Sequence, residues 1–172
     1  MNVLDLIKEG VALFKNKKFD EAIEKLNQAL DEIKDKDSQI QEQNYIQFYL
    51  GCCYFEQALK AKGKESEQLF EHAVEHFQQQ LRPAEQLEDK QNSIEQQVYA
   101  QSWLGRCYLE QAMKAEGKEA AKLFERVVEH FQQQLRLAEQ LEDKQNSIQE
   151  QIYAQNWLAR CYFEQAKKAG CL

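Results

Sequence analysis

Proline and glycine are scarce in this sequence, which has one proline and six glycines among its 172 residues. Both residue types interrupt regular structure and form tight turns, so their scarcity argues against many short elements and for a few long ones. Alanine, leucine, glutamate, lysine and glutamine favour helix, and strand-like alternation of polar and apolar residues is absent. The sequence therefore predicts an all-α fold, and its length suggests one domain.

The sequence also lacks an excess of positive charge and any long apolar run. Its net charge is −7, which argues against binding to nucleic acid or to an anionic membrane surface, because both require basic patches. No apolar run approaches the roughly 20 residues of a membrane span. Residues 1–9 lack the charged start and uninterrupted apolar segment of a signal peptide. We therefore expect a soluble, cytoplasmic protein.

Motifs of catalytic sites are missing as well. No serine or cysteine lies in a nucleophile motif, and no glycine-rich loop could hold a phosphate. Residues 72–76 spell the H-x-x-E-H pattern of a class of zinc proteases. The later copy, residues 126–130, begins with arginine and so loses one ligand, and no third ligand is evident. We therefore expect no enzyme, metal or cofactor, and interpret His72 and His76 as surface residues of an amphipathic helix.

One segment of the sequence occurs twice. Residues 75–94 recur 54 positions later as residues 129–148, with a single substitution. Over the wider ranges 64–115 and 118–169, 39 of 52 positions match. Self-similarity at a fixed period is typical of proteins built from stacked repeats. So close a match fits either a recent duplication or an engineered array.

Small polar clusters and glycines divide the sequence into seven segments in which apolar residues recur every three or four positions, the stripe of an amphipathic helix. The predicted segments are 2–15, 18–34, 38–61, 64–89, 92–115, 118–143 and 146–169. Their predicted N-caps include Ser38, Ser93 and Ser147. Because short turns join the helices, consecutive helices should lie antiparallel. We expect one domain, 1–172, with units of about 2–36, 38–90 and 92–144 and a terminal helix, 146–169.

Residues 9–30 resemble a tetratricopeptide repeat (TPR) in their order of small, apolar and aromatic residues followed by a second helix with the pattern Ala, bulky apolar, Ala. Residues 50–54, 104–108 and 158–162 resemble the Leu-Gly-x-x-Tyr segment of that family. The resemblance implies a superhelical array of antiparallel helix hairpins, an α-solenoid. In such an array the small residue lets two helices approach closely, and the aromatic residue fills the space beside it. First helices line a concave groove in which a peptide or helix of a partner protein binds.

The sequence departs from the family in two respects. Its later unit has 54 residues, against about 34 in the common repeat. The extra residues lengthen each helix by about ten, so the later hairpins should be taller than the first. Some family members clamp a partner's C-terminal carboxylate with Lys and Asn. Where that Asn would lie, this sequence has Lys8, Tyr49, Trp103 and Trp157, which argues against the clamp.

The five cysteines do not suggest a disulfide framework. Cys53, Cys107 and Cys161 fall at the same place in successive units, so they should lie in rows rather than pair within a unit. Nothing else in the sequence indicates the oxidising compartment that disulfides require. We expect these three thiols to be reduced and buried, and Cys171 to be more accessible.

A pattern of aromatic residues and arginine marks the first helices of the later units. Tyr99, Trp103, Arg106 and Glu110 are spaced i, i+4, i+7 and i+11, and so share one face. The resemblance places this face in the groove, and aromatic residues and arginine are enriched at binding hot spots. The alternative is that the tryptophans wedge between units as core. The candidate groove residues are Tyr45, Tyr49, Tyr99, Trp103, Arg106, Glu110, Tyr153, Asn156, Trp157, Arg160 and Glu164.

Two functions fit these patterns. The first is a protein–protein interaction scaffold that binds a peptide or helix of a partner, with Arg106 and Arg160 contacting an acidic or C-terminal peptide segment. The second is a structural repeat module that associates end to end with other copies, either an engineered array or a fragment of a longer one. Light scattering against concentration discriminates them, because a groove binder should stay small without its ligand.

Overall fold

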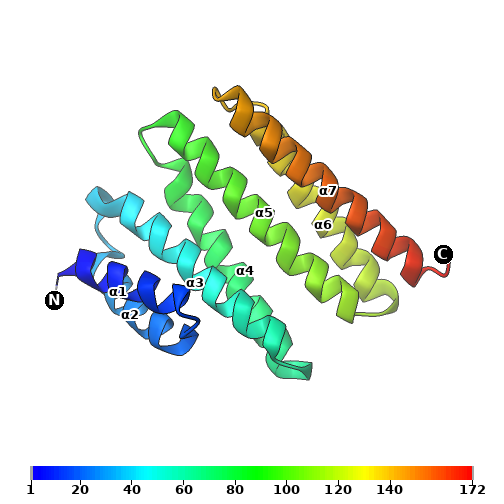
Figure 1. The fold of residues 1–172 in the computed structure, drawn as a ribbon, viewed down its shortest axis with the longest axis horizontal. Helices are drawn as coiled ribbons and strands as arrows, with labels where there is room; N and C mark the ends of the chain where they lie inside the picture. Colours follow the sequence, from blue (N-terminus) through cyan, green and yellow to red (C-terminus); the bar gives the residue numbers. More distant parts are fainter. Residues whose placement is uncertain (1, 172) are drawn as a thin grey trace. The chain divides into compact units, whose positions relative to one another are not determined.

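The computed structural model describes residues 2–171, which are helical almost throughout and contain no strand. The predicted all-α fold in seven helices is confirmed over this range (Figure 1). The helices are α1 (Val3–Lys15), α2 (Phe19–Ile33), α3 (Ile40–Lys60), α4 (Gly63–Glu85), α5 (Lys90–Lys114), α6 (Gly117–Ala138) and α7 (Lys144–Lys168), and a single 3-10 turn, η1 (Asp37–Gln39), precedes α3.

The chain forms two compact units, Met1–Leu87 with α1 to α4 and Glu88–Leu172 with α5 to α7. Within each unit, helices pack mainly on their neighbours in the chain, in antiparallel pairs. The helices α1 and α2 have 13 and 15 residues, whereas α3 and α4 have 21 and 23. The lengthening expected from the 54-residue period is therefore confirmed.

Glycine at the first position of α4 and α6 closes the two tightest connections between long helices. Gly63 and Gly117 both have φ of 57°, the left-handed region that residues with a side chain rarely adopt. In each case only two residues separate the helices, Ala61 and Lys62 before α4, and Ala115 and Glu116 before α6. So short a connection makes the two helices antiparallel neighbours.

Aspartate rather than serine caps α5 and α7. The Asp89 side chain accepts hydrogen bonds from the backbone N–H groups of Gln91 (2.9 Å) and Asn92 (3.1 Å), and Asp143 repeats this arrangement before α7. Because the cap lies four residues upstream of the predicted serine, α5 and α7 begin earlier than expected. The predicted caps Ser93 and Ser147 are therefore wrong, and so is Ser38, because the N-cap position of α3 is Gln39.

Close helix approach at glycine is confirmed within both long hairpins. A Cβ atom added at Gly51 would lie 2.6 Å from Cε1 of Phe77, and one added at Gly105 would lie 2.7 Å from Cε2 of Phe131. Both phenylalanine rings are fully buried. Glycine on one helix thus makes room for an aromatic ring on the other, as the sequence pattern indicates.

The three repeated cysteines are buried free thiols, as predicted, and Cys171 is exposed. Burial raises the pKa of Cys53 to about 12 and that of Cys161 to about 11, and it also raises the pKa of Cys107. A thiol attacks electrophiles as the thiolate, so a raised pKa and burial both make these three groups unreactive.

We expect thiol labelling of the folded protein at neutral pH to be complete at Cys171 well before Cys53, Cys107 or Cys161 reacts. Labelling with maleimide, followed by mass spectrometry of the digested protein, measures each site separately. Labelling in urea is the control and should equalise the four rates. Fast labelling at Cys107 in the folded protein would show that its burial is transient.

Candidate functional site

Two tryptophans and two arginines on α5 and α7 form a continuous row in the second unit, which we call the Trp–Arg row (Trp103, Arg106, Trp157 and Arg160). The Arg106 guanidinium carbon lies 4.1 Å from the centroid of the Trp103 ring and 5.4 Å from that of Trp157. The Arg160 guanidinium lies 5.0 Å from the Trp157 centroid. Cations and indole rings therefore alternate from one helix to the other.

The repeat explains how the row arises. Each tryptophan precedes its arginine by three residues, so both lie on one side of their helix, and the spacing of 54 residues places the same pair on α5 and α7. Cation–π contacts of this kind are worth about 0.5–1 kcal/mol when exposed and about 2 kcal/mol when desolvated. They restrict the conformations that the guanidinium groups can adopt.

Trp157 combines the two roles that the sequence left open. Its ring stacks on the fully buried Phe131 ring of α6, with centroids 6.0 Å apart and planes 4° from parallel. It also contacts the guanidinium of Arg106. The half-buried tryptophan is thus core on one side and part of the row on the other.

The other candidates of this unit lie near the row with different exposure. Tyr99, Tyr153 and Asn156 are exposed, and the Tyr153 ring meets Trp157 edge-on at 6.0 Å. Partial burial, Glu150 and Glu95 together raise the pKa of Tyr99. Glu110 and Glu164 are half-buried, and the Glu164 carboxylate lies 3.9 Å from Lys167 Nζ.

Tyr45 and Tyr49 belong to an aromatic cluster of the first unit. Their rings lie 4.8 Å apart, and Tyr49 also contacts Phe14 at 5.4 Å and Phe48 at 5.2 Å. Burial and the hydroxyl of Tyr45 raise the pKa of Tyr49. Tyr49 therefore helps to pack α1 against α3, whereas Tyr45 keeps an exposed ring.

A repeated contact between histidine, glutamine and tyrosine was missed in the sequence. In the first unit, His76 Nδ1 lies 2.7 Å from Gln47 Oε1, and the His76 ring stacks on Tyr54 at 5.3 Å. The second unit repeats it with His130, Gln101 and Tyr108. The distances there are again 2.7 Å and 5.3 Å. The pattern was visible, because glutamine seven residues before tyrosine and histidine 22 residues after it recur in both copies.

This contact corrects the interpretation of His76 as a surface residue. His76 is half-buried, and desolvation lowers its pKa to about 4. His72, by contrast, is exposed and lies 3.6 Å from Glu75. Among the described residues, no group of three or more His, Cys, Asp or Glu side chains is placed to hold a metal ion.

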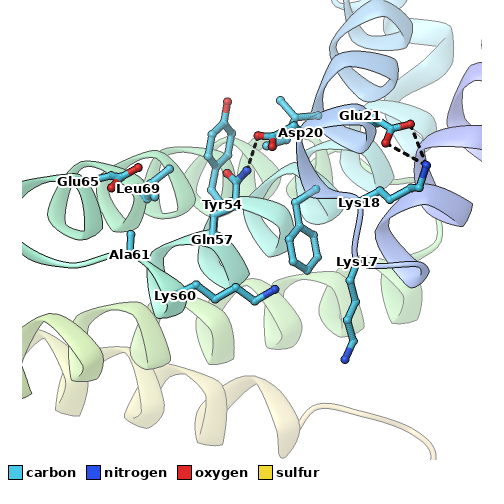
Figure 2. A pocket seen from close by; sticks show the side chains of 12 residues that line it. Lys17, Lys18, Asp20, Glu21, Tyr54, Gln57, Lys60, Ala61, Glu65 and Leu69 are labelled. Carbon is cyan, nitrogen blue, oxygen red and sulfur yellow. Dashed lines mark hydrogen bonds and ion pairs between the residues drawn. The ribbon is translucent and has the colours of Figure 1, made fainter.

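The first unit also has a pocket of about 780 Å³ between α2, α3 and the start of α4 (Figure 2). Gln57 donates a hydrogen bond to Asp20 at 2.7 Å, and Lys18 lies 3.1 Å from Glu21. The Lys60 ammonium group lies 4.6 Å from the centroid of the Phe19 ring. Because three lysines and three acidic residues line it, the pocket shows no preference for a ligand of either charge.

In the described part of the chain, every helix is too short or too polar to cross a membrane. Comparison of the sequence and structure with protein-family models, with curated proteins and with solved structures finds no match.

Proposed function

We propose that this protein is a cytoplasmic protein–protein interaction scaffold of the TPR kind with lengthened repeats, and that it binds a peptide or helix of a partner protein. The observation that carries the proposal is the Trp–Arg row, in which both arginines lie against the only two tryptophans of the chain. The antiparallel hairpins and the close approach at Gly51 and Gly105 support the TPR kind of array.

The chemistry of the row favours a carboxylate ligand. A guanidinium group can donate two parallel hydrogen bonds to a carboxylate, and this contact is both strong and directional. Stacking on indole rings reduces the conformational freedom that Arg106 and Arg160 would lose on binding. An acidic segment or a C-terminal carboxylate is therefore the ligand group that we propose.

The net charge of the protein limits how such a ligand is attracted. At −7 the protein repels acidic peptides at long range, so the attraction must come from local contacts. Local contacts beside half-buried rings are screened by salt less than exposed ones. Binding should therefore weaken little as the salt concentration rises.

The experiment uses a library of acidic peptides with free C-terminal carboxylates, and follows binding by tryptophan fluorescence. Both tryptophans lie in the row, so their emission reports on ligands that bind there. We expect replacement of Arg106 and Arg160 together by alanine to weaken the best binder by about a hundredfold or more, because each hydrogen bond to a charged group is worth about 1.5–3 kcal/mol.

The matched control is Arg136→Ala, which removes an exposed arginine whose guanidinium contacts only the local Gln133 among the bonds described, at 2.7 and 3.0 Å. It should leave binding unchanged. Circular dichroism of the double variant must still show a helical protein. Loss of the helical spectrum would instead identify the two arginines as structural, and binding that survives the double substitution would place the ligand site elsewhere.

A further inference from the structure

One side of α7 carries large apolar side chains that no helix of this unit covers. Ile148, Ile152, Tyr162 and Phe163 are each between 51% and 56% exposed, and Ala159 between them is exposed as well. We call these five residues the open face of α7. Tyr162 is nine residues from Tyr153, about two and a half helical turns, and so lies opposite it, whereas Phe163 lies about 80° from Tyr153 around the helix.

The same positions of α5 are buried by α6. Ile94 and Val98, which correspond to Ile148 and Ile152, form a buried apolar cluster with Leu137, Ala138 and Leu141. In α5 this side is therefore an interface between helices. The sequences of α5 and α7 are nearly identical at these positions. Leu137 belongs to α6, and Leu141 follows the end of that helix.

Polar contacts between α5 and α6 accompany the apolar ones. His130 of α6 lies 2.7 Å from Gln101 and stacks on Tyr108, and Arg126 donates a hydrogen bond to the Tyr108 hydroxyl at 3.3 Å. The matching residues of α7 are Gln155 and Tyr162. They present the same acceptor and the same ring, and both are exposed.

A pocket continues the open face toward α6. It has a volume of about 350 Å³ and is lined by Tyr162 and Gln165 of α7 and by Phe124 and Val128 of α6, among others. In the first unit, the corresponding tyrosine and glutamine, Tyr54 and Gln57, line a pocket whose third wall is α4. The second unit thus has two of the three walls of that pocket.

We propose that the open face of α7 binds an amphipathic helix of another protein, packed antiparallel to α7 as α6 packs on α5. The helix would place leucine-like residues against Ile148 and Ile152, and a hydrogen-bond donor such as histidine against Gln155 and Tyr162. This site lies on a different side of α7 from Tyr153 and does not depend on the proposed function of the Trp–Arg row.

Ala159 sets the shape of the helix that fits. The corresponding Gly105 leaves room for the Phe131 ring, and a Cβ atom at that position would come within 2.7 Å of it. A helix with phenylalanine at this register must therefore shift away from Ala159. The natural partner should carry a smaller residue there, and replacing Ala159 by glycine should admit the larger ring.

The probe is a fluorescently labelled synthetic peptide of residues 116–141, which contains α6, titrated with the 172-residue protein and followed by anisotropy. We expect saturable one-to-one binding. Phe163→Asp should weaken it by about tenfold or more, because burial of such a side chain is worth about 1.5–3 kcal/mol. Ala159→Gly should tighten it by about fivefold or more, since relief of overpacking is worth at least about 1 kcal/mol.

Leu4→Asp is the matched control, since it places the same charge at an equally exposed apolar side chain of α1 in the first unit, and it should leave peptide binding within about twofold. The proposal is overturned if the peptide does not bind, or if Leu4→Asp weakens binding as much as Phe163→Asp. It is also overturned if Phe163→Asp leaves the affinity for the peptide unchanged, because the peptide would then be replacing the protein's own α6 instead of binding to the open face of α7. Sedimentation velocity that shows a dimer dissolved by Phe163→Asp would make a second copy the occupant, and would equally refute it.

Discussion

Replacing Phe55 by alanine is expected to lower the free energy of unfolding of the first unit by about 3–5 kcal/mol, the usual cost of deleting a buried aromatic ring. The Phe55 ring is 2% exposed and packs edge-on against the fully buried Phe70, with centroids 5.7 Å apart. Neither α3 nor α4 can close the space that the ring would leave without moving other buried side chains. Urea unfolding followed by circular dichroism measures the change.

Phe163→Ala is the matched control, because residue 163 occupies in α7 the repeat position that residue 55 occupies in α3. Phe163 is 55% exposed, so its removal should change the free energy of unfolding by less than about 0.5 kcal/mol. The intrinsic helix propensity changes identically in both variants. A loss of several kcal/mol in Phe163→Ala would mean that the open face of α7 is covered in solution.

Acid is expected to destabilise both units as the pH falls below about 6.5, because each contains a half-buried histidine. His76 and His130 have pKa values of about 4 in the folded protein, against 6.5 in an unfolded chain. Desolvation is the main cause in both. Near His76, Glu75 opposes the shift and His72 adds to it, and near His130, Arg126 adds to it.

The direction of this pH effect depends on whether the folded or the unfolded state binds the proton more tightly. Above about pH 6.5 both states are neutral and stability is complete. As the pH falls from about 6.5 to about 4, the unfolded chain takes up a proton that the folded chain does not, so stability is lost. Each histidine should remove about 2 kcal/mol between about pH 7 and pH 5, which urea unfolding at a series of pH values measures.

Three substitutions separate this effect from general acid unfolding. His76→Gln and His130→Gln should each flatten the pH dependence of their own unit in this range. The exposed His72→Gln should change it much less, because His72 is the smallest of the three causes of the lowered pKa of His76. Equal pH profiles in all four proteins would show that the two buried histidines do not control acid stability.

The sequence predicts local structure here better than it predicts which helix meets which side chain. The seven helices follow from apolar spacing, and the close approach at Gly105 follows from a small residue beside large ones. Asp89 and Ser93 are both good N-cap residues one turn apart, and the spacing rule cannot choose between them. In the α7 copy, Ser147 instead donates a hydrogen bond to the Ala138 carbonyl at 2.8 Å, a partner contributed by another helix.

Prediction of the candidate site from the sequence is limited in the same way. Helical spacing places Trp157 and Arg160 on one face, but only the neighbouring helices decide that Phe131 takes one side of the indole ring. The partial burial of His76 is not evident from the sequence, because its partners, Gln47 and Tyr54, come from a different helix. Contacts that join separate segments carry no local signature, although the repeat preserves them in both copies.

The packing of helices on their chain neighbours also bears on how quickly the protein folds. Bringing two segments together costs entropy that grows with the length of the loop between them. The connections before α4 and α6 contain two residues each, so these hairpins close with almost no loop at all. Folds dominated by such local contacts belong to the fast end of the observed range of folding rates. Each long hairpin can thus assemble as soon as its second helix has been synthesised, without waiting for the rest of the chain.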